Sequence, residues 1–498
     1  MAIWPIFVAG EWAESPDKLV VTKPGTSAEA GTTFLATPAQ YEAAVSRACG
    51  VRADLAAMPA YERIRVLTGV ADRIDARRDE LAGLLCAEAG KPVRDARTEV
   101  ERSALTFRVA AAEVAQPGGE VLPLDINVAS RGRFGITWRF PAGPVAAISP
   151  FNLPVSLSVH KVAPAMAVGA PVVLKVPSAA PLTMLAVARL IDEAGALPGS
   201  VSVLPMSRRL GDRMVTDDRF KVLSFTGSPA VGWDMKARAG KKKVVLELGG
   251  NAAAIVDESA DLQWAAQRCA YGAFKYAGQT CISVQRIYVH ERVWDGFAAA
   301  FTACAGALRL GDPADPATDL GPMIDEAAAA RAEEWVCDAV AAGAKVLLGG
   351  ERGGAWYPPT VLAGVPEDAR VCRDEAFAPV AVLAPVADFA EALRRVNQSV
   401  FGLQAGVFTR DVWRCWQAFA QLEVGGVILN DAPTYRVDHM PYGGVKDSGL
   451  GREGVRYAMA DMTEPRLLVV APPSPAAPSA AQGVGRAAGD VTRAPRPS

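Results

Sequence analysis

The stretch VAAISPFNLPVSLSVHKVAPAMAVGAPVVLKVPS, residues 145–178, decides the fold class of this chain. It opens with a short apolar run at 145–149, continues with a helix-like pattern from 153 to 168, and returns to an apolar run at 171–176. Apolar runs joined by a helix are typical of parallel strands that are covered on both faces. The stretch therefore predicts an α/β fold with a parallel sheet between two layers of helices. The alternation continues towards residue 250, with strands expected at 201–204, 221–225 and 244–248 and helices at 182–196 and 230–239.

The flanking regions extend this picture. Residues 5–12 read as an N-terminal hairpin, residues 38–114 carry a helical pattern, and RGRFGITWRF at 131–140 alternates like a strand. The end of the chain, 471–498, is rich in Pro, Ala, Ser and Gly and is expected to be a disordered tail. A second α/β domain is expected after residue 251, with strands at 287–290, 346–348, 380–384 and 427–430.

The composition of the chain limits the kinds of binding partner to be expected. The chain has 498 residues, enough for two or three domains, and its 52 Lys and Arg against 54 Asp and Glu give a net charge of −2. This near-neutral charge argues against binding to nucleic acid and against a polybasic surface that binds membranes. No apolar run reaches the ~18 residues of a membrane span, and the start lacks the features of a secretory signal. We therefore expect a cytoplasmic protein with small-molecule partners and without membrane or nucleic-acid binding.

One of the eight cysteines stands in a polar, glycine-containing stretch, YAGQTCIS at 276–283. The thiolate of Cys281 would be a good nucleophile towards a carbonyl carbon. The alternative is a buried thiol that only fills space, as most free cysteines do. The cysteines form no C-x-x-C pair and no metal-ligand spacing with the three histidines, so neither a disulfide framework nor a metal site is expected.

Polar residues follow the predicted strands at their carboxyl ends, where ligands bind in parallel sheets. Asn152 could hold an oxyanion with its side-chain amide, although an Asn at this point could equally cap the following helix. Lys175 could bind a ribose hydroxyl or a phosphate. The turn FTGSPAVG at 225–232 could present a helix N-terminus to a pyrophosphate, but it lacks the G-x-G-x-x-G fingerprint.

Two carboxylates complete the candidate chemistry. Glu247 stands at the end of a strand before Gly249 and Gly250 and is a candidate general base, or else an ion-paired Glu. Glu375 and Phe377 place a carboxylate and an aromatic ring beside the second set of strands, where a sugar and a flat heterocycle could dock.

Taken together, these pieces resemble the aldehyde dehydrogenase superfamily from Phe7 to about Val470. Within it, the segment 430–454 looks closest to the branch of lactaldehyde, phosphonoacetaldehyde and succinic semialdehyde dehydrogenases. The motifs that carry the resemblance are PFNLP at 150–154, VVLKVP at 172–177, FTGSPAVG at 225–232, LELGGN at 246–251, GQTCISVQR at 278–286, EAFAPV at 375–380 and PYGGVKDSGLGREG at 441–454.

The resemblance implies roles for three catalytic residues. Cys281 would attack the aldehyde, and Asn152 with the Cys281 backbone N–H would hold the oxyanion. Glu247 would activate the water that hydrolyses the thioester. The cofactor would be NAD or NADP, held around Lys175, Ser178, Ser149, Pro150, Phe151, Phe225, Thr226, Gly227, Ser228, Gly232, Leu248, Gly249, Glu375 and Phe377.

It also implies a domain plan and an assembly. Residues 1–120 and 142–250 would form a Rossmann-type NAD(P)-binding domain, and 251–445 a catalytic domain. Strands at 121–141 and 461–470 would form a bridging β-hairpin element in a homodimer or homotetramer.

The chain departs from the family at one cofactor position. NAD-preferring relatives usually carry a glutamate three residues after the lysine of the VVLKVP motif, whereas this chain has Ser178. A glutamate there repels a 2′-phosphate, so its absence makes NADP plausible.

The substrate is expected to be a short aldehyde with a remote anion, with neutral hydroxyaldehydes such as lactaldehyde as the alternative. Arg108 and Arg436 fall in segments that resemble substrate-anchoring arginines, and a guanidinium suits a carboxylate or phosphonate. Either arginine could instead be an ordinary ion-pair partner. The full set of candidate substrate residues is Arg108, His160, Thr280, Ile282, Arg436 and His439.

Three other classes of protein are alternatives to an aldehyde dehydrogenase that hydrolyses its thioester. A CoA-acylating enzyme generally lacks a base such as Glu247. A binding protein on the same fold would be favoured by loss of Cys281 or Asn152, and both are present. A cofactor-free cysteine hydrolase would not need the turn at 225–232.

Overall fold

The computed structural model describes residues 2–116 and 118–472. Within these residues, one compact unit takes 2–116 and 140–464, and a second takes 118–139 and 465–472. The predicted tail at 471–498 lies, from residue 473 onwards, outside the described residues.

The larger unit holds an eight-stranded sheet in the order β2-β1-β9-β8-β7-β10-β11-β21. Its five central strands pair in parallel, and the strands at its two ends pair antiparallel. Since β7 pairs with β8 on one side and β10 on the other, the strand order reverses beside β7, and ligands bind at such a switch point. The strands are β1 (Ile6–Val8), β2 (Glu11–Ala13), β7 (Val145–Ile148), β8 (Val172–Val176), β9 (Val201–Pro205), β10 (Val222–Thr226), β11 (Lys243–Glu247) and β21 (Gly449–Leu450).

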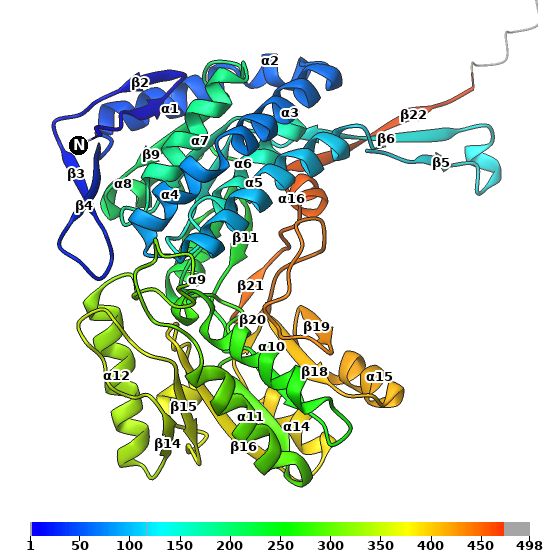
Figure 1. The fold of residues 1–498 in the computed structure, drawn as a ribbon. Coiled ribbons are helices and arrows are strands. Elements are labelled where there is room, and N and C mark those ends of the chain that lie inside the picture. Colours follow the sequence, from blue (N-terminus) through cyan, green and yellow to red (C-terminus); the bar gives the residue numbers. More distant parts are fainter. Residues whose placement is uncertain (1, 117, 473–498) are drawn as a thin grey trace, which may run out of the picture. The chain divides into compact units, whose positions relative to one another are not determined.

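Helices cover both faces of this sheet (Figure 1). Successive residues of a strand point to opposite faces, so Val145 and Ala147 pack in the core with α3 to α7, and Ala146 and Ile148 in the core with α1, α8 and α9. Burial on both faces explains why the strands read as unbroken apolar runs. The helices are α1 (Pro38–Gly50), α2 (Arg52–Ala57), α3 (Ala60–Ala76), α4 (Arg78–Ala89), α5 (Val93–Val114), α6 (Ser156–Val168), α7 (Leu182–Glu193), α8 (Arg208–Thr216) and α9 (Pro229–Arg238).

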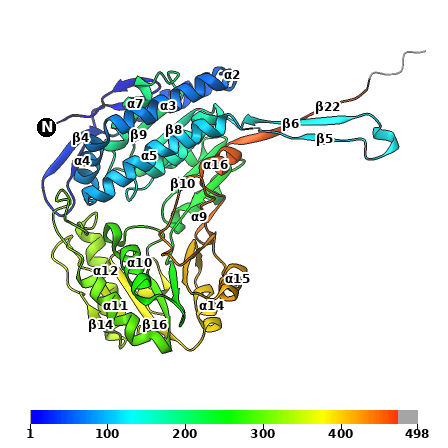
Figure 2. The same cartoon turned by 45° about the vertical axis from the view of Figure 1, so that its right-hand side comes forward.

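A second sheet of seven strands follows, in the order β14-β15-β16-β13-β12-β18-β19. Helices α10 to α12 pack on one face and α14 and α15 on the other (Figure 2). The strands are β12 (Ala253–Val256), β13 (Arg286–His290), β14 (Lys345–Leu348), β15 (Thr360–Ala363), β16 (Val380–Val386), β18 (Gln404–Phe408) and β19 (Gly426–Leu429). The helices are α10 (Leu262–Phe274), α11 (Trp294–Gly306), α12 (Glu326–Ala341), α13 (Arg370–Arg373), α14 (Phe389–Asn397) and α15 (Val412–Gln421). Helix α16 (Val455–Asp461) instead packs against α5 and α6 beside the first sheet.

Smaller sheets complete the architecture. A three-stranded sheet in the order β22-β6-β5 is built from β5 (Val121–Pro123), β6 (Phe134–Pro141) and β22 (Thr463–Val470), and its strands come from the two segments predicted as oligomerisation strands. The others are the hairpin β3 (Lys18–Thr22) with β4 (Glu29–Phe34), and β17 (Phe401–Gly402) with β20 (Val445–Lys446).

The predicted α/β class is confirmed, and each strand predicted between residues 145 and 248 lies within one residue of an observed one. The pattern missed β12, β15 and β18, which are short or follow polar turns. Within the described ranges no helix combines the length and apolar character of a membrane crossing. No group of His, Cys, Asp and Glu in that part of the chain could hold a metal ion.

Candidate active site

Cys281 follows a strained turn between α10 and β13. Tyr276, Ala277 and Gly278 adopt left-handed backbone angles with φ of 48°, 52° and 65°. A side chain at Gly278 would overlap the carbonyl of Ala378, so this position requires glycine. Consecutive left-handed residues are unfavourable unless the surroundings hold them, and such strain is typical of functional sites.

Contacts with the first helical layer hold the turn in place. The buried Tyr276 donates its hydroxyl proton to the carbonyl of Ala89 at 2.8 Å, and the Lys91 ammonium lies 4.4 Å from the centroid of the Tyr276 ring. Lys91 is itself buried, pairs with Glu99 and donates to the carbonyl of Asn152 at 2.8 Å. One buried lysine therefore connects the nucleophile turn with Asn152.

Asn152 does not cap a helix. Helix α6 begins at Ser156, and its first N–H groups, those of Val155 and Ser156, donate to Glu99 at 3.1 Å instead. The buried Asn152 amide donates to the carbonyl of Gln279 at 3.0 Å, two residues before the nucleophile. The amide thus faces the turn that carries Cys281, as an oxyanion donor should.

The thiol of Cys281 is half-buried beside an apolar cluster of Ile282, Leu403 and Tyr442. Its sulfur lies 3.0 Å from the Tyr442 hydroxyl. Burial raises the pKa of the Cys281 thiol to about 12, against a smaller lowering by the hydrogen bond from Tyr442. The raised pKa favours the protonated thiol.

Glu247, the last residue of β11, is the carboxylate predicted as the general base for hydrolysis. Both of its carboxylate oxygens are buried and lack a hydrogen-bond partner within the described residues. Burial, together with repulsion by Glu453, raises the pKa of the Glu247 carboxyl well above its usual value. A buried carboxyl with a raised pKa and no fixed partner is suited to accept a proton from water.

A buried charge network lies behind these two groups. Glu453 accepts from Lys161 at 3.0 Å and from Arg436 at 2.9 Å, and all three side chains are at most 6% exposed. The Arg436 guanidinium lies 3.8 Å from the centroid of the Tyr442 ring. Arg436 therefore stands beside the same tyrosine that contacts the nucleophile.

His160 joins a second buried pair. Its Nε2 lies 2.9 Å from Asp438, which also accepts from Arg102 at 2.7 Å. Burial and the nearby Arg436 charge lower the pKa of His160, which favours the neutral ring. His160 contributes a hydrogen-bonding ring rather than a second fixed charge.

Several buried polar atoms around Cys281 have no hydrogen-bond partner in the described part of the chain. Buried polar groups are nearly always paired, so such a concentration indicates space for water or a polar ligand. The atoms are His160 Nδ1, Glu247 Oε1 and Oε2, Thr280 Oγ1, Thr434 Oγ1 and Arg436 Nε.

The predicted cofactor residues lie at the carboxyl ends of the first sheet and at the facing loop. A side chain at Gly249 would overlap the Glu375 carboxylate, which also accepts from the Gly250 N–H at 3.0 Å. Burial raises the pKa of Glu375 to about 7. The rings of Phe151 and Phe377 meet edge to face with their centroids 5.9 Å apart.

The turn at 225–232 carries further residues that were predicted to bind the cofactor. Side chains at Gly227 and Gly232 would overlap Phe225 and Leu248 respectively, so the backbone approaches closely only because both are glycine. Ser228 occupies the N-cap position of α9 but makes no capping hydrogen bond with its side chain. Thr226 leaves a buried hydroxyl without a partner among the described residues. These features fit a dinucleotide whose polar groups would complete the hydrogen bonds.

Lys175 lies within β8, Ser178 follows that strand, and Ser149 follows β7. The buried Ser149 accepts a hydrogen bond from Ser158 at 2.8 Å, and Pro150 is the next residue. Burial and the nearby Arg208 lower the pKa of Lys175, while Ser178 is exposed.

Two predicted substrate residues are not part of this group. Arg108 is 41% exposed on α5 and pairs with Asp72 at 3.0 Å and Asp75 at 2.6 Å. Arg108 is therefore an ordinary surface ion-pair partner, the alternative given in the sequence analysis. The buried face of α5 is formed by other residues of the helix. His439 is also exposed, and its side chain makes no contact with the group in the described residues, although its neighbour Asp438 does. The prediction for these two residues is corrected.

Sequence reasoning missed the functional positions of Tyr442, Lys161, Glu453 and Asp438. Tyr442 and Glu453 belong to the family motif at 441–454, and this could have marked them as candidates. No sequence pattern indicated that Tyr442 contacts Cys281 or that Glu453 pairs with Lys161. Lys161, a charged residue inside an apolar helix, could have been recognised as needing a buried partner.

Comparison with known proteins agrees with this geometry. Residues 12–468 match the model of the aldehyde dehydrogenase family. The chain is 43% identical over 466 residues to a 3-sulfolactaldehyde dehydrogenase of Priestia aryabhattai. The aligned region covers 93% of this chain and 97% of that protein.

Two solved structures are similar throughout. Aldehyde dehydrogenase 21 from Physcomitrella patens, in complex with the reaction product succinate, has a TM-score of 0.93 and 47% identity over 94% of this chain and 98% of its own. A glyceraldehyde-3-phosphate dehydrogenase from Methanocaldococcus jannaschii, complexed with NADP, has a TM-score of 0.88 and 37% identity over 92% of this chain and 99% of its own.

Proposed function

Since the chain belongs to the aldehyde dehydrogenase family, we propose that it oxidises a short aldehyde carrying a remote anionic group to the carboxylic acid. As a member of this family it is an oxidoreductase that uses NAD or NADP. The finer statements below concern its substrate, its mechanism and its cofactor preference.

The observation that carries the substrate proposal is the Arg436 side chain. It is only 6% exposed, and its Nε has no hydrogen-bond partner in the described residues, although its Nη2 is held by Glu453. A donor of this kind beside Tyr442 and Cys281 suits the carboxylate, sulfonate or phosphonate oxygen of a short substrate. A neutral aldehyde would leave the Nε donor unpaired, which costs free energy.

The covalent step begins at Cys281. The thiol proton leaves to solvent water, and the sulfur forms a bond with the aldehyde carbon while the carbonyl π electrons move to oxygen. The Asn152 amide and the Cys281 backbone N–H then hold that oxyanion in a thiohemiacetal. The adjoining Tyr442 hydroxyl fixes the direction of the sulfur before attack.

The residues predicted for the cofactor would hold the dinucleotide that completes the oxidation. A bound nicotinamide would supply the hydride acceptor that oxidation of the aldehyde carbon needs. Glu375 would bind the nicotinamide ribose, and Phe377 would pack beside the ring, with Phe151 against it. Lys175 would bind the adenine ribose.

Hydrolysis releases the product. Glu247 would remove a proton from water, the water oxygen would add to the thioester carbon, and the carbon–sulfur bond would break to return the thiolate. This role argues against the CoA-acylating alternative, which would not need a buried carboxylate at the end of β11.

The named relatives support an anionic substrate. The Priestia relative takes its name from a sulfonate-bearing aldehyde, and the Physcomitrella structure holds a dicarboxylate product. For this chain we propose succinic semialdehyde and sulfonate or phosphonate aldehydes of similar length as first candidates, with a neutral hydroxyaldehyde as the alternative.

For the cofactor we propose that NADP is accepted at least as readily as NAD. Ser178 removes the repulsion of a carboxylate, and the Arg208 charge is near enough to Lys175 to lower its pKa. A 2′-phosphate there would meet two cations and a hydroxyl donor.

We further propose the domain plan and assembly expected from the sequence. The first sheet takes its strands from residues up to 247 and from 449–450, and the second takes its strands from 253–429, in support of a boundary near residue 250. The β22-β6-β5 sheet carries exposed Trp138, Leu467 and Leu468, in support of pairing with another copy.

The test is a spectrophotometric comparison of kcat/KM across short anionic and neutral aldehydes, with NAD and with NADP. Succinic semialdehyde and 3-sulfolactaldehyde should exceed lactaldehyde by at least about tenfold, as expected for a charge-assisted pair of ~1.5–3 kcal/mol. A preference for neutral or long alkyl aldehydes would overturn the proposal.

A further inference from the structure

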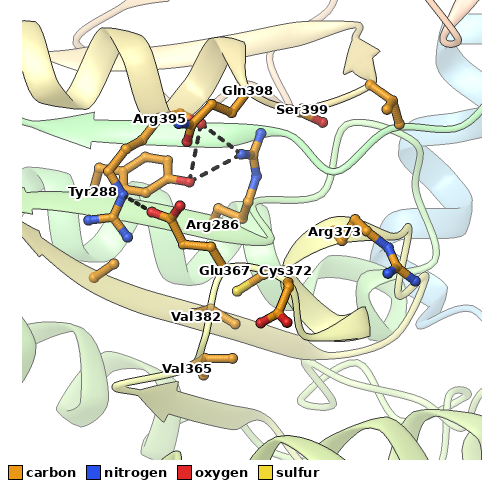
Figure 3. A pocket seen from close by; sticks show the side chains of 13 residues that line it. Arg286, Tyr288, Val365, Glu367, Cys372, Arg373, Val382, Arg395, Gln398 and Ser399 are labelled. Carbon is orange, nitrogen blue, oxygen red and sulfur yellow. Dashed lines mark hydrogen bonds and ion pairs between the residues drawn. The ribbon is translucent and has the colours of Figure 1, made fainter.

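A pocket separate from the catalytic cysteine opens in the second α/β layer (Figure 3). It has a volume of about 290 Å³, near the lower end of the ~300–1,000 Å³ of small-molecule sites. Its walls come from β13, β16, helix α13 and the end of α14, and they combine apolar side chains with Arg286, Arg395 and Cys372. None of these residues takes part in the chemistry proposed above.

Arg286 is the unusual member of this pocket. It is only 7% exposed, and no carboxylate of the described residues lies within ion-pair distance of it. Its Nε donates to the carbonyl of Asn251 at 3.0 Å, and its Nη1 donates to the Tyr288 hydroxyl at 3.1 Å and the Arg395 carbonyl at 3.3 Å. All three acceptors are neutral, and Nη2 makes no hydrogen bond within the described part of the chain.

The other cations of the pocket already have partners. Arg395 lies 2.6 Å from Glu367, an ion pair drawn in Figure 3, and Arg373 pairs with Asp374 at 2.8 Å. Asp368 also lines the pocket but is exposed at its edge. The uncompensated charge is therefore that of Arg286, and a buried cation without a counter-ion is costly.

We propose that this pocket binds a small organic anion, whose carboxylate or phosphoryl oxygens pair with Arg286. Apolar Val365, Val382 and Val400 would contact the carbon part of the ligand. An arginine fork suits both kinds of anion, and the volume limits the ligand to a compact molecule.

Hydrogen bonds connect the lining of this pocket to the segment that carries Glu375, so occupancy of the pocket would be linked to cofactor binding. The carbonyls of Cys372 and Arg373 accept from the Asn251 amide at 3.0 Å, and Gln285 holds the carbonyl of Asp374 at 2.7 Å, directly before Glu375. A ligand that orders this segment would fix the Glu375 carboxylate. This linkage rests on the proposed role of Glu375.

Cys372 provides a direct test in the unaltered protein, because it lines the pocket and is partly accessible. Alkylation by N-ethylmaleimide would be followed by peptide mass spectrometry, with citrate and inorganic phosphate as probes. Citrate at ten times its Kd should slow the labelling of Cys372 roughly tenfold, in a saturable way. The exposed Cys337 serves as the internal control and should label at an unchanged rate.

Two comparisons make the result specific. Trimethyl citrate and potassium chloride of matched ionic strength should not protect Cys372, and Arg286→Gln should abolish the protection by citrate. Arg394→Gln, an exposed arginine of α14 outside the pocket, should retain it. Unprotected Cys372 in the wild-type protein at millimolar citrate and phosphate would overturn the site, whether or not the variant folds.

The linkage is measured separately as the Kd of NADP with and without saturating citrate. We expect citrate to change that Kd, and NADP to change the citrate Kd by the same factor. An unchanged Kd with intact protection of Cys372 would overturn the linkage. Glu375→Gln tests the proposed role of Glu375, on which the linkage rests. An unchanged NADP Kd in this variant would contradict that role.

Discussion

The hydroxyl of Tyr442 lies 3.0 Å from the sulfur of Cys281. The same ring packs against the guanidinium of Arg436, so one side chain contacts both the nucleophile and the proposed substrate anchor. The arrangement orients a protonated thiol whose pKa burial has raised. It also means that changes at residue 442 should be visible in the chemistry of the thiol before any substrate is added.

Tyr442→Phe should make the thiol less acidic. The hydrogen bond from Tyr442 favours the thiolate, so its loss raises the pKa of Cys281 further and lowers the thiolate fraction at any pH below that pKa. A bond to a charged group is worth ~1.5–3 kcal/mol, so iodoacetamide should inactivate the variant at least about tenfold more slowly. The check is the pH dependence of the inactivation rate, with the partly exposed Tyr457→Phe as the control.

Cys281→Ala should abolish aldehyde oxidation and leave NADP binding intact, because the thiol supplies the covalent step and makes no dinucleotide contact. Cys304→Ala, on the half-exposed helix α11, should retain full activity. Steady-state assays and NADP titration of both variants would settle the point. Substantial turnover by the Cys281 variant would contradict its role as nucleophile.

Glu247→Gln should give a burst of about one reduced cofactor per active site and then very slow turnover, since acylation and hydride transfer precede the attack of water. In the wild type the raised pKa of Glu247 means that the base form appears only as pH rises, so kcat should increase with pH and then level off. Stopped-flow absorbance at several pH values measures both effects. Absence of the burst would place Glu247 in thiol activation instead.

Arg436→Leu should raise KM for succinic semialdehyde at least about tenfold while changing KM for lactaldehyde much less, because only the anion loses a charge-assisted bond. The variant also leaves Glu453 with one partner fewer, so folding is checked by circular dichroism. Arg108→Leu is the matched control and should change neither KM. Equal effects on both substrates in the Arg436 variant would contradict the anchor.

Ser178→Glu should shift preference towards NAD. The new carboxylate would repel a 2′-phosphate near Lys175 and Arg208 and could accept from a ribose hydroxyl. The measurement is the ratio of kcat/KM for NADP and NAD in both proteins. A wild-type enzyme with no NADP activity would show that other residues decide the preference.

The parallel strands of the first sheet could be predicted closely because burial on both faces leaves an apolar run with few alternatives. Strand-end residues such as Asn152 and Glu247 could be predicted as well, since topology brings the carboxyl ends to one edge. Their partners could not, because the contact between Cys281 and Tyr442 spans 161 residues and depends on packing of the whole unit. Arg108 failed for a local reason: its helix buries the adjacent Phe107, which turns Arg108 towards the surface.

The buried Lys91, which connects Asn152 with the turn before Cys281, also bears on how the protein acquires activity. Tyr276 and Ala89, which meet beside Lys91, are 187 residues apart in the chain. During synthesis the oxyanion donor emerges long before the nucleophile, and closure of so long a loop is among the slower steps of folding. After dilution from denaturant, we therefore expect helical structure to return first and enzymatic activity last, with the delay set by the docking of residues 276–281 onto helices already formed.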